Sequence, residues 1–131
     1  MEDNYQRNDK KGKKGFKRLY NALFFSLDGI KAAWKEEEGF RQVFSVGLVL
    51  SIVAFFLAQN WQELILLILP CVLSVIVELI NSAIENAIDF TSLEIHPLAK
   101  KAKDMGSAIQ LMACLFVAFV WGSYLLMRFV L

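Results

Sequence analysis

Three long apolar runs, separated by short polar segments, dominate the chain. They cover residues 43–58, 64–77 and 105–127, and Glu63 is the one charged residue between 42 and 77. A helix needs about 20 apolar residues to cross the ~30 Å hydrocarbon core of a bilayer. With their flanking residues, the runs predict membrane-spanning helices over about 41–58, 62–90 and 104–130. The predicted fold is therefore all-α and integral to the membrane.

A different periodicity precedes the first run. Between Phe16 and Trp34, apolar residues recur in steps of three and four, opposite basic positions such as Lys17 and Lys35. Basic residues with large aromatic rings favour a helix that lies on a membrane surface, here residues 16–35. Residues 1–14 have almost no apolar content, so we expect a disordered polar tail. Residues 15–131 would form a single membrane-embedded domain.

The polar end of the second run carries a stripe of acids and amides. Its members recur at i, i+3, i+4, i+7 and i+11, which places them on one face of a helix: Glu78, Asn81, Ser82, Glu85 and Asp89. A thirty-residue helix is roughly 45 Å long, so about a third of it must protrude. A charge at the bilayer centre costs about 2.5–3.5 kcal/mol. We therefore expect Glu78 at headgroup depth and Glu85 about 10 Å further out, in water.

The distribution of charge predicts the topology. The N-terminal segment and the polar connection at 91–103 are rich in Lys and Arg, whereas the turn at 59–63 has neither. Cytoplasmic loops carry the excess of basic residues, so the N-terminus and the acidic stripe should face the cytoplasm. The formal net charge of +1 argues against a nucleic-acid partner. Cys71 and Cys114, both within apolar runs, are interpreted as small buried hydrophobes.

The acidic stripe suggests an enzyme. Phosphate-binding glycine loops and a Ser–His–acid hydrolase motif are absent from the sequence. Paired carboxylates suit Mg²⁺, which shares its coordination sphere with phosphates, and a further acid can take a proton from a lipid hydroxyl. Glu37 and Glu85 can reach the aqueous phase to bind the metal, whereas Glu78 lies at headgroup depth, where a general base would meet the lipid hydroxyl.

Two other properties follow from the polar stripes. Three helices alone cannot screen such stripes from lipid, which predicts a homo-oligomer with sites between subunits. A small ion or proton channel is the alternative from another class. A channel needs polar groups through the full depth of the bilayer, whereas here they stop at one face, which favours the enzyme.

Two motifs carry a family resemblance. The run from Glu78 to Asp89, followed by that from Ala102 to Ala108, resembles the signature of the prokaryotic diacylglycerol kinase family. The segment from Trp34 to Arg41 is similar to that family's Trp-x-x-Glu-x-x-Phe-Arg pattern. The resemblance implies a homotrimeric lipid kinase of the bacterial inner membrane that uses MgATP to convert diacylglycerol to phosphatidic acid. Undecaprenol kinases share most of the motif and remain an alternative, although Gly106-Ser107-Ala108 resembles the diacylglycerol branch.

The resemblance also implies roles for individual residues. Glu78 would be the general base, and Glu37 and Glu85 would hold Mg²⁺. The residues expected to contact ATP are Arg18, Phe25, Asn81, Glu94, His96, Lys103 and Asp104. Those expected to contact the lipid are Ser26, Lys31, Trp34, Phe40, Arg41, Gln42, Ser107 and Trp121. The chain departs from the family pattern at Phe25, where Tyr is expected, and at Leu27-Asp28, where a Trp-Lys-type pair is expected.

Overall fold

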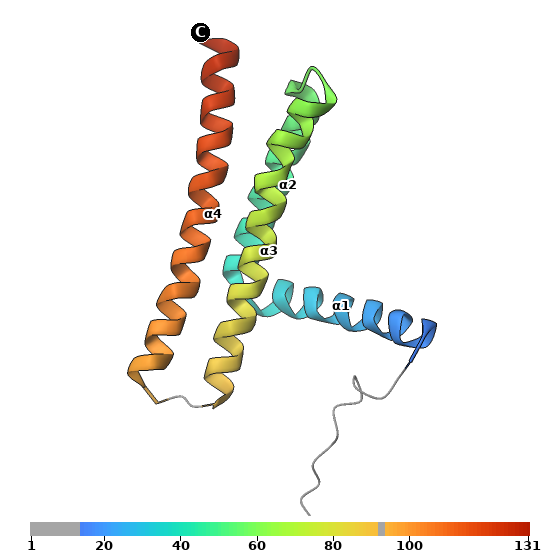
Figure 1. The fold of residues 1–131 in the computed structure, drawn as a ribbon, viewed down its shortest axis with the longest axis vertical. Helices are drawn as coiled ribbons and strands as arrows, with labels where there is room; N and C mark the ends of the chain where they lie inside the picture. Colours follow the sequence, from blue (N-terminus) through green and yellow to red (C-terminus); the bar gives the residue numbers. More distant parts are fainter. Residues whose placement is uncertain (1–13, 92–93) are drawn as a thin grey trace, which may run out of the picture.

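The described part of the chain forms four helices. The computed structural model describes residues 14–91 and 94–131, which contain α1 (Phe16–Glu36), α2 (Glu38–Leu57), α3 (Trp61–Thr91) and α4 (Pro97–Phe129). Helices α2, α3 and α4 run side by side, whereas α1 extends across their direction near one end of the bundle (Figure 1). The expected all-α fold is confirmed, and α2, α3 and α4 are each long and apolar enough to span a membrane. Apart from Lys14, the expected tail at 1–14 lies outside the described residues.

Helices α1 and α2 meet at a single non-helical residue, Glu37 (φ −104°, ψ 109°). Arg41 reaches back from α2 and donates from Nη1 to the carbonyl oxygens of Trp34 (2.9 Å) and Lys35 (3.2 Å). These carbonyls belong to the last turn of α1, which has no helical partner for them. The ring of Trp34 also meets that of Phe44 edge-on at 5.6 Å. These contacts fix the direction in which α1 leaves the bundle.

The core of the bundle lies between α2, α3 and α4, toward the end that carries the α2–α3 turn. Its buried side chains are Ala54, Leu67, Cys71 and Trp121. The indole of Trp121 donates to the carbonyl of Leu67 at 3.1 Å. The hydroxyl of Tyr124 lies 3.1 Å from the carbonyl of Leu57 and 3.0 Å from a carboxylate oxygen of Glu63. Polar contacts therefore tie α4 to both α2 and α3 at this end.

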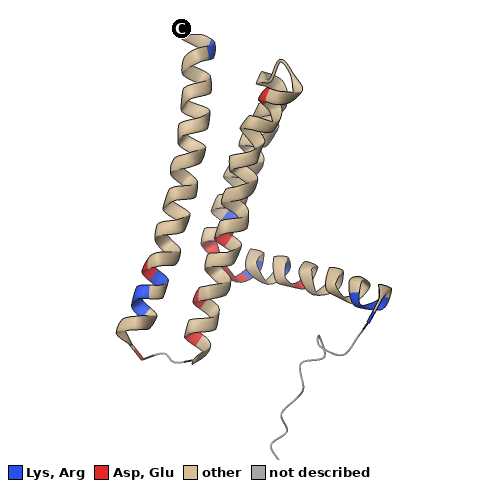
Figure 2. Cartoon of the chain, viewed as in Figure 1, with Lys and Arg blue, Asp and Glu red and all other residues tan. Residues whose placement is uncertain are grey.

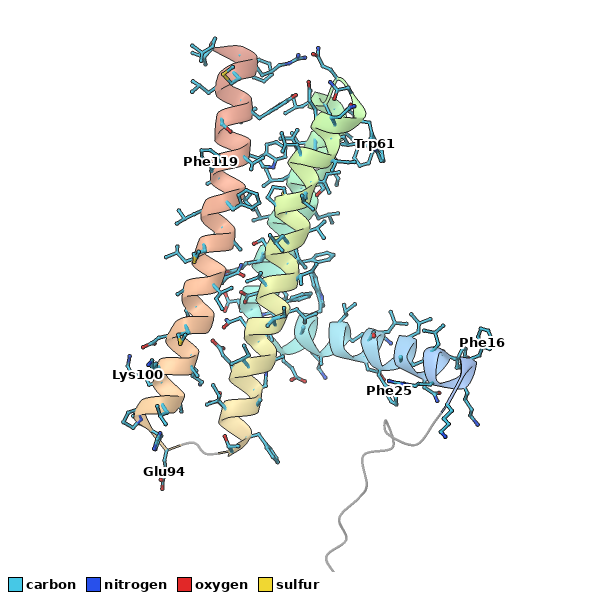
Figure 3. The ribbon with its side chains drawn as sticks, in the orientation of Figure 1. Phe16, Phe25, Trp61, Glu94, Lys100 and Phe119 are labelled. Atoms are coloured by element: carbon cyan, nitrogen blue, oxygen red, sulfur yellow. The ribbon has the colours of Figure 1, made fainter. Side chains whose placement is uncertain are left out.

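Large apolar side chains cover most of the outer surface of the helices (Figure 3). Phe56, Leu111 and Phe119 are 85%, 61% and 72% exposed. Water-soluble monomers rarely expose such continuous apolar surface, whereas helices in contact with lipid require it. The chain is a membrane protein.

Two expectations about local structure were wrong. The polar connection was expected to continue to Lys103, but α4 begins at Pro97, seven residues before the expected start at 104. Proline is well suited to the first helical position, and the side chain of His96 caps the helix by accepting from the N–H of Leu98 at 3.2 Å. Cys114 is exposed rather than buried, although Cys71 is buried as expected.

Candidate active site

A buried polar stripe runs along α3. In the described part of the chain, the buried polar or charged side chains are those of Ser74, Glu78 and Ser82, which are 4%, 8% and 5% exposed. Their four-residue spacing places them on one face of the helix. The carboxylate of Glu78 packs against the backbone of α2 at Gly39, because a Cβ added to Gly39 would overlap its Oε1. The predicted base is thus sheltered between two helices.

The predicted metal-binding acids lie close to Glu78. Glu85 follows Glu78 by two turns of α3, about 10 Å along the axis, and Glu37 lies two residues before Gly39, which contacts Glu78. Asn86 donates from Nδ2 to Oε1 of Glu37 at 2.7 Å and to the carbonyl of Ser82 at 2.8 Å, which joins the α1–α2 junction to α3. Figure 2 shows acidic positions at the start of α2 and along the lower half of α3. The structure therefore brings the three predicted acids into one region.

The donor set in this region fits a hard divalent cation in part. Within residues 14–91 and 94–131, no three His, Cys, Asp or Glu side chains gather as a metal site would require. Glu37 and Glu85 each use Oε1 in a bond from an asparagine, the latter from Asn81 at 3.4 Å. Each keeps Oε2 for a ligand, and Mg²⁺ commonly takes one or two carboxylates with phosphate and water. Glu37 and Glu85 are therefore of the ligand type that Mg²⁺ uses when it arrives with a nucleotide.

Four of the seven residues expected to contact ATP line one pocket. This pocket has a volume of about 340 Å³, and its polar lining includes Asp89, Glu94, His96, Lys100, Lys103 and Asp104. It lies between the end of α3 and the start of α4, where Figure 3 labels Glu94 and Lys100. Lys103 pairs with Asp89 at 2.6 Å, and Lys100 pairs with Asp104 at 2.5 Å. The predicted Lys-Asp pair is therefore held in two ion pairs beside a polar cavity.

The other predicted ATP contacts lie elsewhere. Asn81 is on α3, three residues after Glu78 in the direction of the α3–α4 pocket. Among the described residues, its buried Oδ1 has no hydrogen-bond partner, and it lies against Gly106 of α4. Arg18 and Phe25 are exposed on α1, which leaves the bundle on the side away from α4 (Figure 3). Within one chain, the structure does not bring these α1 residues to the α3–α4 pocket.

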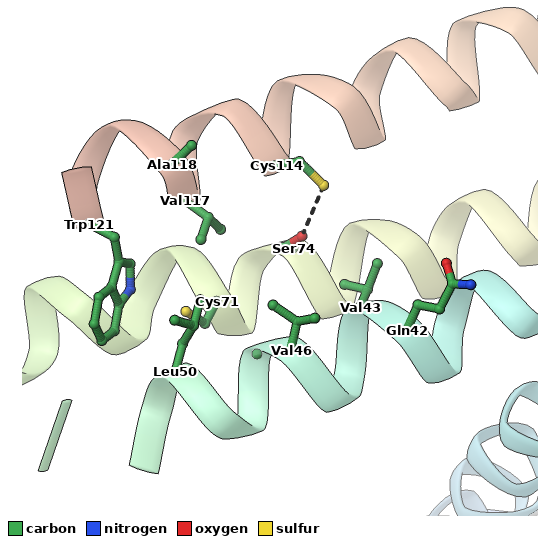
Figure 4. Close-up of a pocket in the computed structure, with 11 residues that line it drawn as sticks. Gln42, Val43, Val46, Leu50, Cys71, Ser74, Cys114, Val117, Ala118 and Trp121 are labelled. Atoms are coloured by element: carbon green, nitrogen blue, oxygen red, sulfur yellow. Dashed lines mark hydrogen bonds between the residues drawn. The ribbon is translucent and has the colours of Figure 1, made fainter. Parts of the chain in front are cut away.

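The eight residues expected to contact lipid fall into separate groups. Ser26 and Lys31 are exposed on α1, and Ser107 is exposed on α4. Four residues lie at the α1–α2 junction. Phe40 is buried and Trp34 is exposed. Arg41 donates to the carbonyl of Trp34, and Gln42 donates to the carboxylate of Glu38. Trp121 is only 6% exposed and lies in the core, where it lines an apolar pocket of about 350 Å³ together with Gln42 (Figure 4).

Sequence reasoning assigned no role to several residues that shape this region. Asp89 stood in the acidic stripe, but its pairing with Lys103 depends on how α4 packs. Asn86 lies beside Glu85 and off the stripe, so helical spacing alone did not select it. Gly39 allows the close approach of Glu78, and Gly106 allows that of Asn81. In the sequence, the available signal for these approaches was a glycine within or next to each motif.

Replacing Asn86 with alanine should impair metal use. The change removes the donor that orients Glu37, and loss of such supporting hydrogen bonds typically weakens metal affinity 10- to 100-fold. We expect the Mg²⁺ concentration for half-maximal turnover to rise about tenfold, as measured by Mg²⁺ titration of the purified protein. Thr91→Ala, which removes a hydroxyl bonded only within its own helix, is the control. An unchanged Mg²⁺ curve for Asn86→Ala would show that Asn86 does not position Glu37.

The fold and this site define an integral membrane enzyme that has most of its acidic groups toward one end of a helical bundle. The chain belongs to the prokaryotic diacylglycerol kinase family, whose model matches residues 24–125. This confirms the resemblance seen in the sequence motifs. Membership makes the chain a lipid kinase, an enzyme of nucleotide-dependent phosphoryl transfer.

Several curated relatives are named diacylglycerol kinase. The protein of Helicobacter pylori (strain J99) is 58% identical over 113 residues, which cover 86% of this chain and 88% of the relative. That of Pseudomonas aeruginosa is 48% identical over 116 residues, covering 88% and 94%. That of Escherichia coli (strain K12) is 39% identical over 107 residues, covering 82% and 88%. The similarity therefore extends over most of each chain.

Proposed function

We propose that the chain transfers the γ-phosphoryl group of MgATP to the hydroxyl of diacylglycerol, giving phosphatidic acid, at the cytoplasmic face of the bacterial inner membrane. One observation carries this proposal: the sheltered carboxylate of Glu78 packs against Gly39 in the first turn of α2, with Glu37 at the adjacent junction and Glu85 two turns further along α3. An acid in this position can meet a lipid hydroxyl on one side and a nucleotide on the other.

The direction of α1 supports the depth of Glu78. An amphipathic helix that lies on a membrane marks the boundary between headgroups and hydrocarbon. Gly39, three residues after the end of α1, contacts Glu78. Helix α3 continues for 13 residues beyond Glu78, which is about 20 Å. Glu78 would then lie at the interface, with Glu85 and the α3–α4 pocket in the cytosol.

Each group has a role in the proposed reaction. The lipid hydroxyl oxygen attacks the γ-phosphorus, its proton passes to Glu78, and the bond to the β–γ bridging oxygen breaks to release ADP. Glu37 and Glu85 would hold Mg²⁺, which neutralises charge on the phosphates. Lys103, beside the α3–α4 pocket, supplies positive charge for the nucleotide. Catalysis rests mainly on positioning and electrostatics, as is usual for phosphoryl transfer.

The proposed assembly is a homotrimer with sites between subunits. Arg18 and Phe25 on α1 lie apart from the α3–α4 pocket of their own chain, so α1 of one subunit would complete the nucleotide site of another. The orientation is multi-pass with a cytoplasmic N-terminus, because Lys and Arg gather at the end of the bundle that carries the acids and are absent from the α2–α3 turn.

The test is direct phosphoryl transfer. Purified full-length protein in detergent should transfer ³²P from γ-labelled ATP to diacylglycerol, with undecaprenol offered side by side. Labelled phosphatidic acid with little labelled undecaprenyl phosphate is the expected result. Labelling of undecaprenol alone would identify the alternative kinase. Absence of transfer to either alcohol, together with ion or proton flux in liposomes, would favour the channel.

Glu85→Gln should alter the metal requirement rather than the proton transfer. The amide keeps the shape of the side chain but removes the charge that binds a divalent cation. We expect the Mg²⁺ concentration for half-maximal turnover to rise about 10- to 100-fold, with much of the activity restored at saturating Mg²⁺. Mg²⁺ titration of labelled-phosphate transfer measures this shift. A turnover that falls equally at every Mg²⁺ concentration would contradict the assignment.

A further inference from the structure

We propose that Ser74, Gln110 and Cys114 form a polar subsite that binds the ester carbonyl of the lipid substrate, and that this subsite selects acylglycerols over alcohols without a carbonyl. The inference deepens the proposed function and rests on it. Ser74 on α3 faces Gln110 and Cys114 on α4, between apolar stretches of both helices.

The contacts of this trio are unusual for a helix interior. Gln110 donates from Nε2 to Oγ of Ser74 at 3.3 Å and to Sγ of Cys114 at 3.6 Å, and Ser74 and Cys114 lie 4.0 Å apart. The hydroxyls of Ser51 and Ser123 donate to backbone carbonyls four residues earlier in their own helices. Ser74 instead turns toward α4, into the pocket shown in Figure 4.

The trio contains polar groups that it cannot satisfy by itself. Ser74 is 4% exposed, and its hydroxyl hydrogen has only the Cys114 sulfur, a weak acceptor, within reach. Oε1 of Gln110 is buried without a hydrogen-bond partner in the described structure. If the amide is rotated by half a turn, Ser74 donates to the oxygen and the N–H groups of Gln110 lose their partners instead. In the first arrangement, the Ser74 hydroxyl, which lines the pocket, can exchange the weak sulfur acceptor for a carbonyl of a ligand. In the second, the N–H groups of Gln110 are the donors left without a partner.

The apolar pocket on the α2–α3 turn side of Glu78 supplies the space for such a ligand. It has a volume of about 350 Å³ and is lined by Gln42 and Leu50 of α2, by Ser74 and by Trp121 of α4. From Gln42 to Leu50 it extends about 12 Å along the helix. Apart from the polar groups at its Ser74 end, its lining is apolar. This shape suits a hydrocarbon chain whose polar end is near Ser74.

The distance between Ser74 and Glu78 identifies the chemical class. They are four residues apart on one face of α3, about 6 Å along the axis, with Ser74 on the side toward the bilayer centre. In a diacylglycerol, an ester carbonyl lies a few bonds from the free hydroxyl, toward the acyl chains. With the hydroxyl at Glu78, that carbonyl reaches Ser74. A polyprenol or a dialkylglycerol has only hydrocarbon or ether oxygen at this point.

The alternative is that the trio only joins α3 to α4, as polar side chains often do in membrane helices. The two roles differ in one measurable respect. A structural link affects all lipid alcohols equally, whereas a carbonyl subsite affects only those with an ester. The comparison of a diester with the diether of the same chain length separates them.

The experiment measures kcat/KM for dioctanoylglycerol and for dioctylglycerol with full-length protein in detergent micelles. We expect the wild type to prefer the diester about tenfold, because a buried polar group left without a partner lowers affinity for the analogue that lacks it. Ser74→Ala and Gln110→Leu should lower the diester value toward that of the diether and leave the diether value within about twofold. Ser74→Thr, which keeps the hydroxyl, should restore the preference.

Ser51→Ala is the matched control, since its hydroxyl bonds only within α2, and its preference should equal that of the wild type. Infrared spectra of diester labelled with ¹³C at the carbonyl give a second readout, with a hydrogen-bonded carbonyl band in wild type that is lost in Ser74→Ala. Equal use of diester and diether by the wild type, or an unchanged preference in both variants, would overturn the subsite. Absence of transfer to any acylglycerol would instead overturn the proposed function.

Discussion

Glu78→Gln should lower kcat by about 10²- to 10⁴-fold, the usual contribution of a general base. The amide has the size of the carboxyl group and fits the same space against Gly39, but it cannot take the proton of the lipid hydroxyl. Nucleotide binding should be largely kept, because the α3–α4 pocket does not include residue 78. Steady-state transfer of labelled phosphate and equilibrium binding of ATP measure the two quantities separately.

Glu36→Gln is the control for that variant. Glu36 is exposed in the last turn of α1, so the substitution makes the same change of charge near the site without touching the buried stripe. Its turnover should stay close to wild type. If Glu78→Gln kept wild-type turnover while the protein remained folded, Glu78 would not be the base.

Gly39→Ala should lower kcat about 100-fold while the fold is kept. The added methyl group would occupy the position of the Glu78 carboxylate, and the end of that side chain can move aside without a change in the backbone. A shift of about 1 Å in a reacting group is enough for a loss of this size. Alanine is also the better helix former, by about 1 kcal/mol. Kinetics together with a thermal melt by circular dichroism test both parts.

Gly122→Ala serves as the comparison, because nothing lies within 4 Å of the added Cβ at that position. It should leave the turnover unchanged and raise the melting temperature slightly, because Gly122 lies inside α4 and alanine is the better helix former. Normal activity in Gly39→Ala would mean that Glu78 can act from a different position, and the close approach of α2 and α3 would have no part in catalysis.

The sequence predicts the helices well because each signal is local. The runs at 43–58, 64–77 and 105–127 have the length and composition of membrane spans, and the structure has a helix at each. The beginning of α4 was missed because residues 97–103 have only Leu98 and two alanines beside a proline and three lysines, a composition that looks like a polar loop. Capping by His96 becomes visible only when the backbone is seen.

The site was predictable only in part for a related reason. Helical spacing placed Glu78 and Glu85 on one stripe of a helix, and the structure has that helix as α3. The position of Glu78 at the membrane interface stays a prediction. Pairings between helices depend on their register, so spacing within one helix could not reveal that Asn86 bonds Glu37 or that Lys103 pairs with Asp89. The trio of Ser74, Gln110 and Cys114 escaped for the same reason, since its members are separated by up to 40 residues.

The junction between α1 and α2 has a mechanical consequence. Arg41 binds the end of α1, and Gly39 lies against the Glu78 carboxylate, so α1 and this acid are joined through one junction. With α1 on the membrane surface, as proposed, this junction would set the depth of Glu78 relative to that surface. A thicker or thinner bilayer would therefore be accommodated at the opposite end, around the turn at 58–60, while the depth of Glu78 in the membrane stays constant.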